Sequence, residues 1–418
     1  MSHLKRVSHE RSGSGGRAMD FQITEEAKEL QARARRLAED FAGRAAAHDR
    51  EASSPIENYA ALRREGFYEL NVPKDRGGAG IGLLPWSLAA EELAQGCPAT
   101  ALAFNMHLSI VGPLMEIPEV PQTTKRYIAD LVVKQRKLIA GNFSEPQTSG
   151  LAASHGMPST RARRVEGGYR VNGKKSFASM VEAADYCAIL ARPEEAEVPT
   201  AGILLLIPSD APGRRIEHVW DTLGMRATCS ENVLLEDCWI PEEGGLYRTE
   251  DFPSFIRNGA NWLWASYTAV YLGVGAAAYK EVTRVLKGRV PPGYVQPLAY
   301  HPDVRRRVAE MSVDLEAARL MTYHSAWLSD TQGPTQAALA AMFRAKYFVG
   351  EAVTRITRTA LTLGGAHAIF KTSPLERCFR DGATAPIQFP PADFCLGAVG
   401  VLELGLNLAE MLPPLKRP

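Results

Sequence analysis

The sequence predicts a protein of the α+β class, mainly α, with an N-terminal all-helical domain, a middle β-barrel-like domain and a C-terminal antiparallel four-helix bundle. Apolar residues recur with a helical period in the first third of the chain, with an extended period between Leu138 and Pro241, and with a helical period afterwards. We therefore expect domains at 19–137, 138–245 and 246–418. Residues 1–18 are rich in Ser, Gly and Arg, and we expect them to form a disordered tail.

The N-terminal third begins with an amphipathic helix. Its apolar residues follow one another at steps of three and four, which places them on one buried face, and Thr24 is a suitable N-cap. A second helical pattern covers 56–65, and a loop rich in Gly and Pro, 73–80, leads to further helices that reach about residue 135. The apolar face of the first helix consists of Ile23, Ala27, Leu30, Ala34, Leu37 and Phe41.

The middle third contains short apolar runs of the kind that form strands. Two short segments with glycine are hairpin signals, because glycine tolerates a positive φ. They are Glu166-Gly167-Gly168 and Asn172-Gly173. Strands of this number and length predict a compact, barrel-like sheet. The expected strands include 168–171, 186–190, 203–207 and 233–235.

The last third has the pattern of long helices. Pro302 stands just before one of them, and Asp303 lies in its first turn, where the helix dipole favours a carboxylate. Four long helices with short connections predict an antiparallel bundle. The helical segments lie near 260–288, 303–330, 335–363 and 392–411.

The composition favours an enzyme that acts on a small molecule. With 48 Lys and Arg against 47 Asp and Glu, the net charge is +1, so neither a nucleic acid nor an anionic membrane is an expected partner. The six cysteines never approach CxxC spacing, which predicts reduced, mostly buried thiols in a cytoplasmic protein. No apolar run is long enough to span a membrane, and no cluster of residues has metal-ligand spacing.

Small hydroxyl residues and aromatic residues stand at the expected ends of two strands. The first passage is Asn142-Phe143-Ser144-Glu145-Pro146, and the second runs from Asn172 to Ser179. Hydroxyls and backbone amides can hydrogen-bond the polar edge of a flat heteroaromatic ring, and an aromatic side chain can cover its face. A flavin fits this description, although such residues at strand ends are more often turn formers and core residues.

Three motifs raise the weight of the flavin interpretation. They are Phe143-Ser144-Glu145-Pro146, the passage Val171 to Ser179, and Leu223-Gly224-Met225-Arg226, in this order. Together they resemble the middle domain of the acyl-CoA dehydrogenase superfamily, which also includes flavin-dependent monooxygenases. The resemblance spans roughly Met19 to the C-terminus, and the superfamily has the same order of helical, β and helical domains.

The resemblance implies a bound FAD, with FMN as the runner-up, and it assigns roles in the middle domain. Phe143 and Ser144 take positions beside the pyrimidine edge of the flavin ring, and Ser179 takes the position that hydrogen-bonds near N5. Phe177 replaces the Trp that the family usually places against the ring. A donor near N5 favours the reduced flavin, so Ser179 is the first residue to test.

The resemblance also implies a dinucleotide site between subunits of a homodimer or homotetramer. Gly364 and Gly365 keep the glycine pair of the family's pyrophosphate motif, and Arg289 takes the position of an Arg that reaches the flavin of a neighbouring subunit. The Gln that usually precedes the glycine pair is replaced by Leu361. His367 follows this pair, and a lone His there is more often a helix-end residue than a catalytic group.

The sequence departs from the family at the catalytic base, so the catalytic residue stays unknown. The usual base lies about nine residues after an Arg-Asp pair, and counting from Arg380-Asp381 reaches Phe389. The alternative position in some relatives corresponds to 260–265, which contains no carboxylate. Asp393 and Glu403 lie downstream, where each is expected to be a solvated helix residue.

Three functions remain open at this stage. The leading hypothesis is an FAD-dependent dehydrogenation of an acyl thioester, with an electron-transfer partner that reoxidises the flavin. The second is a monooxygenase of the same fold that receives reduced flavin from a reductase and acts on a small aromatic or amine; relatives of that kind often carry a His where this chain has Gln388. The third is a flavin-binding protein without catalytic activity.

Overall fold

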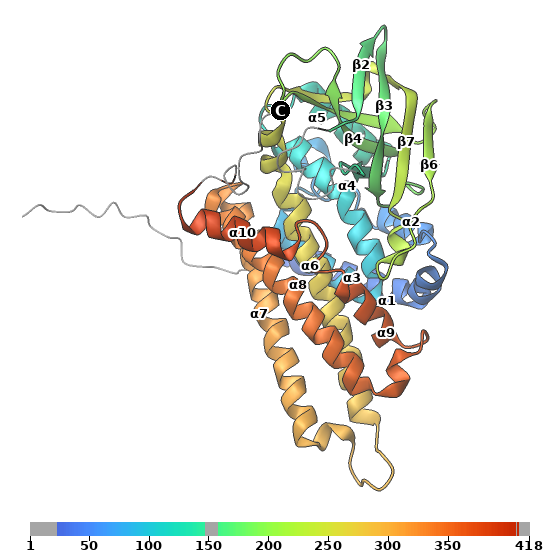
Figure 1. Cartoon of the computed structure of the whole chain (residues 1–418), viewed down its shortest axis with the longest axis vertical. Coiled ribbons are helices and arrows are strands. Elements are labelled where there is room, and N and C mark those ends of the chain that lie inside the picture. The colour runs from blue at the N-terminus through green and yellow to red at the C-terminus, as the bar shows by residue number, and fades with distance from the viewer. Residues whose placement is uncertain (1–22, 147–157, 407, 409–418) are drawn as a thin grey trace, which may run out of the picture.

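The computed structural model describes residues 23–146, 158–406 and 408, and the tail predicted at 1–18 lies outside them. Helices form the N-terminal part, a sheet follows, and long helices form the rest of the chain (Figure 1). One cluster of buried apolar residues runs through all three parts, so they share a continuous core. This order of elements confirms the predicted fold class.

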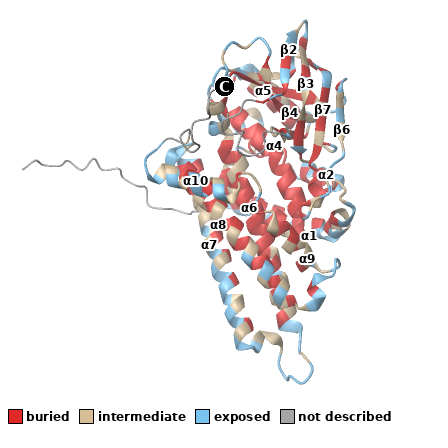
Figure 2. Ribbon diagram, in the orientation of Figure 1, coloured by how far each residue is buried: buried red, intermediate tan, exposed pale blue. Residues whose placement is uncertain are grey.

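The N-terminal helices pack around a fully buried helix. Thr24 caps the first helix as predicted, since its hydroxyl accepts a hydrogen bond from the amide of Ala27 at 3.2 Å. The fourth helix is buried on all sides and lies at the centre of the molecule (Figure 2). The helices are α1 (Glu25–Glu51), α2 (Ile56–Arg64), α3 (Leu83–Gly96), α4 (Pro98–Glu116) and α5 (Gln122–Ala129).

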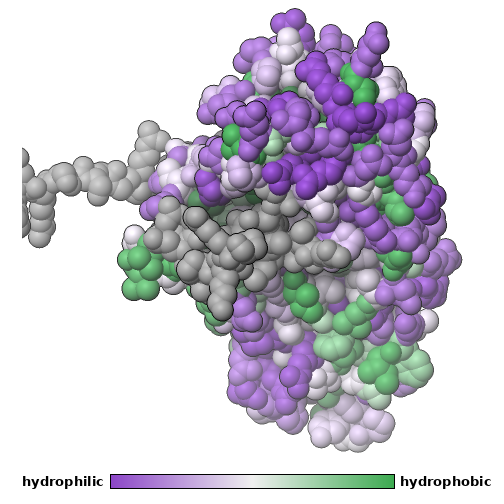
Figure 3. Space-filling model, turned by 45° about the horizontal axis from the view of Figure 1, so that its top comes forward, coloured by the Kyte–Doolittle hydropathy of each residue, from purple (hydrophilic) through white to green (hydrophobic). Residues whose placement is uncertain are grey.

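The middle part is a mixed sheet of eight strands in the order β6-β7-β3-β2-β4-β5-β8, with β1 pairing in parallel with β4. It contains all four predicted strands. Hydrophilic side chains cover the surface over the sheet (Figure 3). The strands are β1 (Ile139–Asn142), β2 (Arg161–Val165), β3 (Gly168–Ala178), β4 (Tyr186–Pro193), β5 (Gly202–Pro208), β6 (Arg214–Glu217), β7 (Glu231–Pro241) and β8 (Gly245–Thr249).

One of the two predicted hairpin turns is present and the other is wrong. Gly167 has φ 74° in the tight turn between β2 and β3. Asn172-Gly173 instead lies within β3, where the pairing with β7 shifts register between Val171 and Gly173. A Cβ atom on Gly173 would lie 2.5 Å from the Thr160 hydroxyl. The glycine therefore permits a close approach at a bulge rather than a chain reversal.

The described residues of the C-terminal part, which reach 406 and include 408, form three long α-helices and two short ones. The first begins at Phe252, eight residues before the predicted start, because the Asp251 side chain caps it by accepting from the Ser254 amide at 3.1 Å. The last ends at Glu403 and not at 411, and Gly405 follows with φ 71°. The helices are α6 (Phe252–Gly288), α7 (Pro302–Gln332), α8 (Gln336–Gly364), α9 (Pro374–Ala383), which was not predicted, and α10 (Ala392–Glu403).

Helix α6 connects the parts of the molecule, because it packs against α3 and α4 as well as against α7, α8 and α9 (Figure 1). All six cysteines are buried and free, as the sequence predicted. Among the described helices, none combines the length and the apolar character needed to cross a bilayer.

Candidate functional site

A cavity of about 580 Å³ lies between α4, α6, the end of the sheet and the loop that follows α9. Its volume falls within the range of small-molecule sites. Two helices supply one face each: Leu102, Met106, Ser109, Ile110 and Pro113 from α4, and Phe255, Ile256, Gly259, Ala260, Leu263, Trp264 and Tyr267 from α6. These residues recur at steps of three and four, as one side of a helix requires.

The four residues predicted in the middle domain come together on one wall of the cavity. Phe143 and Ser144 follow β1, while Phe177 lies near the end of β3 and Ser179 just beyond it. The amide of Ser176 donates to the carbonyl oxygen of Ser144 at 3.0 Å, so a backbone hydrogen bond joins the two segments.

The ring of Phe177 is available for contact with a ligand. Phe177 lines the cavity, yet 51% of its surface is exposed. The ring of Trp220, which also lines the cavity, meets it edge to face with 6.0 Å between the centroids. The indole of Trp220 donates to the carbonyl oxygen of Met225 at 3.3 Å, which fixes its orientation. A flat ring system can therefore stack on Phe177 without displacing the core.

A chain of hydroxyl groups runs along the same wall. The hydroxyl oxygens of Ser179 and Ser230 are 2.7 Å apart, and those of Ser230 and Thr228 are 2.8 Å apart. Thr228 also donates to the carbonyl oxygen of Met225 at 2.9 Å. Each hydroxyl carries one proton, so with Thr228 donating to Met225, Ser230 donates to Thr228 and Ser179 donates to Ser230. Ser179 can accept from a ligand as it stands, and it can donate to one when it gives up its bond to Ser230.

Unusual backbone conformations gather beside this wall. Phe177, Met180, Met225 and Cys229 have φ values of 59°, 52°, 54° and 43°, in the left-handed region that disfavours residues with large side chains. Each such residue costs about 1–3 kcal/mol unless surrounding contacts hold it. Strain of this kind concentrates at functional sites, and no sequence motif predicted it here.

A buried ion pair holds the two predicted segments together. The Lys175 ammonium donates to the Glu145 carboxylate at 2.7 Å, and both residues are at most 1% exposed. Ser159 and Thr160 add hydrogen bonds to the same carboxylate from their amides and hydroxyls. Burial opposes ionisation, but Lys175 and these donors outweigh it and lower the pKa of Glu145 to about 2.

The third motif joins the sheet to the bundle. The amide of Met225 donates to the Asp381 carboxylate at 2.6 Å, and Arg380 donates to the carbonyl oxygen of Leu223 at 3.1 Å. Arg380 also forms a buried ion pair with Asp49 of α1. Burial raises the pKa of Asp381 to about 6, and the hydrogen bond from Met225 counters only part of this effect.

Gly224→Ala is expected to weaken the contact between the segment 223–226 and α9. A Cβ atom at this position would lie 2.3 Å from the carbonyl oxygen of Arg380, so the loop or α9 must move. Because Gly224 and Thr384 both line the cavity, we expect at least a tenfold loss of flavin affinity with the fold retained. Flavin titration and circular dichroism check this, with Gly400→Ala as the control, since nothing lies within 4 Å of its added Cβ atom. Unchanged affinity would contradict the prediction.

Neither expected position for a catalytic base carries a carboxylate. Phe389 lines the cavity, and its ring centroid lies 5.8 Å from that of Trp264 and 5.6 Å from that of Phe394. The cavity wall formed by described residues contains neither Asp nor Glu. Asp393 and Glu403 are exposed on α10, and Glu403 pairs with Arg344.

The residues predicted for the dinucleotide site meet each other, but they do not line the cavity. Arg289 follows α6 and donates to the carbonyl oxygen of Gly364 at 3.4 Å. A Cβ atom on Gly365 would lie 3.0 Å from the Arg289 guanidinium. His367 is exposed in a short helical turn, and its ring stacks with that of Phe370.

Several cavity residues escaped the sequence analysis. Tyr267, Ser230 and Thr228 carry hydroxyls that stand in no motif, and Trp220 lies in a loop after β6. The face of α4 was also missed, because a helix that is apolar on every side gives no directional signal. The apolar positions of α6 that face the cavity look the same in the sequence as those that face the core.

The residues present fit a flavin. An exposed aromatic face, a chain of hydroxyls and two apolar helix faces match a ring system that is flat, apolar on its faces and polar at one edge. Among the described residues, no group of three or more His, Cys, Asp or Glu side chains is placed to hold a metal ion.

Comparison with known proteins gives a consistent result over most of the chain. Family models described as the N-terminal, middle and C-terminal domains of acyl-CoA dehydrogenase match residues 24–132, 140–238 and 256–388. YdbM of Bacillus subtilis, which is named after the acyl-CoA dehydrogenases, is 31% identical over 358 residues, covering 86% of this chain and 92% of YdbM.

A second relative is named for another reaction on a CoA thioester. The 3-sulfinopropanoyl-CoA desulfinase of Paraburkholderia xenovorans is 29% identical over 397 residues, covering 93% of this chain and 99% of the desulfinase. Among solved structures, a glutaryl-coenzyme A dehydrogenase in complex with glutaryl-CoA superposes with a TM-score of 0.84 at 23% identity, covering 94% of this chain and 98% of that chain. This structural similarity shows that the two chains share a fold.

Proposed function

Because the chain belongs to the acyl-CoA dehydrogenase family, we propose that it is a flavin-dependent oxidoreductase that binds FAD in the cavity and acts on an acyl thioester there. The observation that carries this proposal is the shared cavity wall of Phe143, Ser144, Phe177 and Ser179. Two segments that are more than 30 residues apart in sequence meet there, and the buried pair of Lys175 and Glu145 fixes their spacing.

The positions of the side chains in the cavity wall support a role for each of them in binding the flavin. Phe177 would cover one face of the flavin ring, Phe143 and Ser144 would contact its polar edge, and Ser179 would donate a hydrogen bond near N5. When bound, a flavin supplies an acceptor for two electrons from the carbon chain next to the thioester. The apolar faces of α4 and α6 would hold the acyl group and exclude water.

We propose further that the site is shared between two copies of the chain in a homodimer or homotetramer. Arg289, Gly364 and Gly365 lie together outside the cavity, where they can receive the dinucleotide part of a partner's FAD. Exposed large apolar side chains near them in the sequence support an interface in this part of the bundle. These are Val290, Tyr294, Val295, Ile369 and Phe370.

The leading reaction is α,β-dehydrogenation of the acyl thioester, and an electron-transfer partner would reoxidise the flavin. Among the described residues, the cavity wall offers no carboxylate to take the α-proton, and Phe389 occupies the expected place. We therefore expect slow dehydrogenation in the native protein. The same observation favours a second candidate, oxygen-dependent hydroxylation of a small molecule with reduced flavin from a reductase, since that reaction needs no carboxylate at this place.

Two arms of one experiment separate these candidates. In the first, purified protein with bound FAD is mixed anaerobically with butanoyl-CoA, and bleaching of the flavin absorbance is followed by stopped flow. In the second, reduced FMN or FAD is added with oxygen and indole, and product formation is measured. Bleaching supports dehydrogenation, oxygen-dependent product supports the second candidate, and a protein that takes up no flavin at all contradicts both.

Ser179→Ala is expected to slow flavin reduction about 10- to 100-fold, because one hydrogen-bond donor to the reduced ring is lost. Ser176→Ala is the matched control. Ser176 lies in β3, three residues before Ser179, has no hydrogen-bond partner for its hydroxyl among the described residues, and does not line the cavity. Equal reduction rates in both variants would remove Ser179 from the site.

A further inference from the structure

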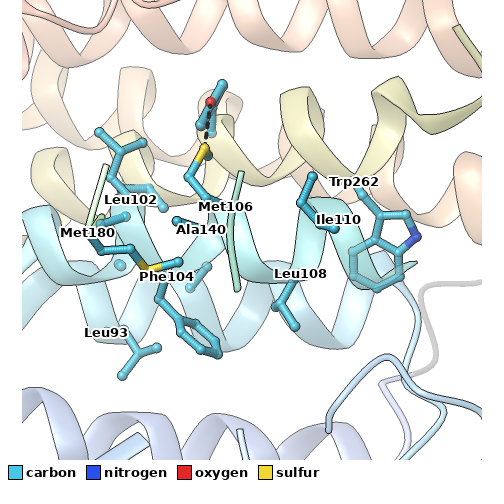
Figure 4. Packing of buried hydrophobic residues seen from close by; sticks show 14 of the residues in the cluster. Leu93, Leu102, Phe104, Met106, Leu108, Ile110, Ala140, Met180 and Trp262 are labelled. Carbon is cyan, nitrogen blue, oxygen red and sulfur yellow. Dashed lines mark hydrogen bonds between the residues drawn. The ribbon is translucent and has the colours of Figure 1, made fainter. Parts of the chain in front are cut away.

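The hydroxyl group of Tyr267 stands out among the polar groups of the cavity. Tyr267 is 5% exposed, and its hydroxyl donates to the sulfur of Met106 at 3.6 Å, the contact marked by the dashed line at the Met106 sulfur in Figure 4. A thioether is a weak acceptor, whereas a buried phenol usually finds an oxygen partner. The hydrogen-bonding capacity of Tyr267 is therefore poorly used within the protein.

The neighbouring hydroxyls in this part of the cavity are already engaged. Ser109 donates to the carbonyl oxygen of Met106 at 2.9 Å, and Thr384 donates to that of Asp381 at 2.7 Å. Burial raises the pKa of Tyr267, so its hydroxyl stays protonated and remains a donor at neutral pH. Of the three hydroxyls of Ser109, Tyr267 and Thr384, only that of Tyr267 donates to a sulfur atom, so it alone gains a stronger hydrogen bond when a ligand places an oxygen atom beside it.

Gln388 makes this place more polar still. It lines the cavity from the loop after α9, and burial raises the pKa of Tyr267 while the interaction of its hydroxyl with the Gln388 side chain opposes that rise. The amide can both donate and accept. The side chains around this pair are apolar, among them Leu102, Met106 and Leu263. A plain alkyl chain would leave the pair facing methylene groups, an arrangement that binding sites for alkyl chains avoid.

We propose that Tyr267 and Gln388 bind an oxygen atom on the acyl group, so that the preferred substrate is an oxygen-substituted acyl thioester rather than one with a plain alkyl chain. This inference rests on the proposed function, since it takes an acyl thioester to be the ligand. Tyr267 donates its hydroxyl proton to the substituent, and Gln388 supplies the second hydrogen bond. Both residues contact the substrate directly and determine specificity.

Calorimetric binding to the FAD-loaded protein tests the proposal without depending on turnover. The ligands are butanoyl-CoA, 3-hydroxybutanoyl-CoA and 4-hydroxybutanoyl-CoA. We expect at least one hydroxylated thioester to bind about tenfold more tightly than butanoyl-CoA. Tyr267→Phe should reduce this ratio to about one.

Tyr271→Phe is the matched control. Tyr271 lies one turn further along α6, its hydroxyl pairs with Thr384 at 3.0 Å, and it does not line the cavity, so this variant should keep the native ratio. An equal affinity of the native protein for all three ligands, or a ratio that survives Tyr267→Phe, would overturn the inference and leave the proposed function intact. Binding of none of the three would overturn the proposed function, and the inference with it.

Discussion

Lys175→Met is expected to destabilise the protein by about 3–5 kcal/mol, because it leaves the buried carboxylate of Glu145 without its counter-charge. The loss is a large part of the stability of an ordinary domain. It also removes the tie between the segment with Phe143 and Ser144 and the segment with Phe177, so we expect the variant to retain little flavin. Urea unfolding and the flavin content of the purified protein measure the two effects.

The neighbouring residue provides the control for this change. Lys174→Met removes the charge one position earlier, from an ion pair with Glu217 in which both side chains are more than a third exposed. Exposed pairs contribute about 0–1 kcal/mol, so this variant should keep nearly native stability and flavin content. Equal destabilisation by the two substitutions would show that the Lys175 pair has no special role.

The same pair predicts how stability depends on acid. The folded pKa of Glu145 is about 2 and its ordinary value is 4.5, so the carboxylate stabilises the fold above pH 4.5, and this contribution is lost as the pH falls towards 2. The ionisation of Asp381 has the opposite effect on stability. Its folded pKa of about 6 lies above the ordinary value of 3.8, so the ionised carboxylate destabilises the folded state. Between pH 6 and 4, protonation of Asp381 therefore favours the folded state, and acid unfolding should begin only below about pH 4.5.

Local sequence patterns predicted the order of the domains and most of the strands, but they did not by themselves assign residues to the cavity. The change of hydrophobic period separates the sheet from the helices on either side, and strand ends are marked by glycine and small polar residues. The resemblance to the acyl-CoA dehydrogenase superfamily then placed Ser144 and Ser179 in one predicted site, and both line the cavity. Their partners across the cavity could not be found, because α4 and α6 are apolar over most of their surface.

The missed features depend on contacts between distant parts of the chain. Met180 and Met225 adopt left-handed backbone conformations against their intrinsic preference, because packing and the hydrogen bond from Met225 to Asp381 hold them there. Gly173 misled the hairpin prediction because a glycine marks either a turn or a close approach, and only the neighbouring Thr160 decides between them. The hydroxyl of Tyr267 became informative only when its acceptor proved to be a sulfur atom.

Phe389→Glu is expected to raise the rate of acyl-CoA dehydrogenation about 10²- to 10⁴-fold, the range that a positioned general base contributes. Phe389 lines the cavity at the place where the family's base is expected, so a carboxylate there would face the α-carbon of a bound thioester. The rings of Trp264 and Phe394 would keep water away from it and raise its pKa. The rate of anaerobic flavin reduction by butanoyl-CoA should therefore increase with pH and level off well above pH 4.5, the ordinary pKa of a Glu side chain.

Two further variants identify the carboxylate at position 389 as the cause of this gain. Phe389→Gln introduces a side chain with the shape of Glu that cannot accept a proton. Phe394→Glu introduces a carboxylate into the same aromatic cluster but outside the cavity wall. Both should reduce flavin no faster than the native protein. If Phe389→Glu binds FAD and butanoyl-CoA but shows no gain, the α-carbon does not lie beside this position, and the result favours oxygen-dependent hydroxylation, which needs no base here. A gain confined to Phe389→Glu would mean that the native protein lacks only the proton acceptor of a dehydrogenase.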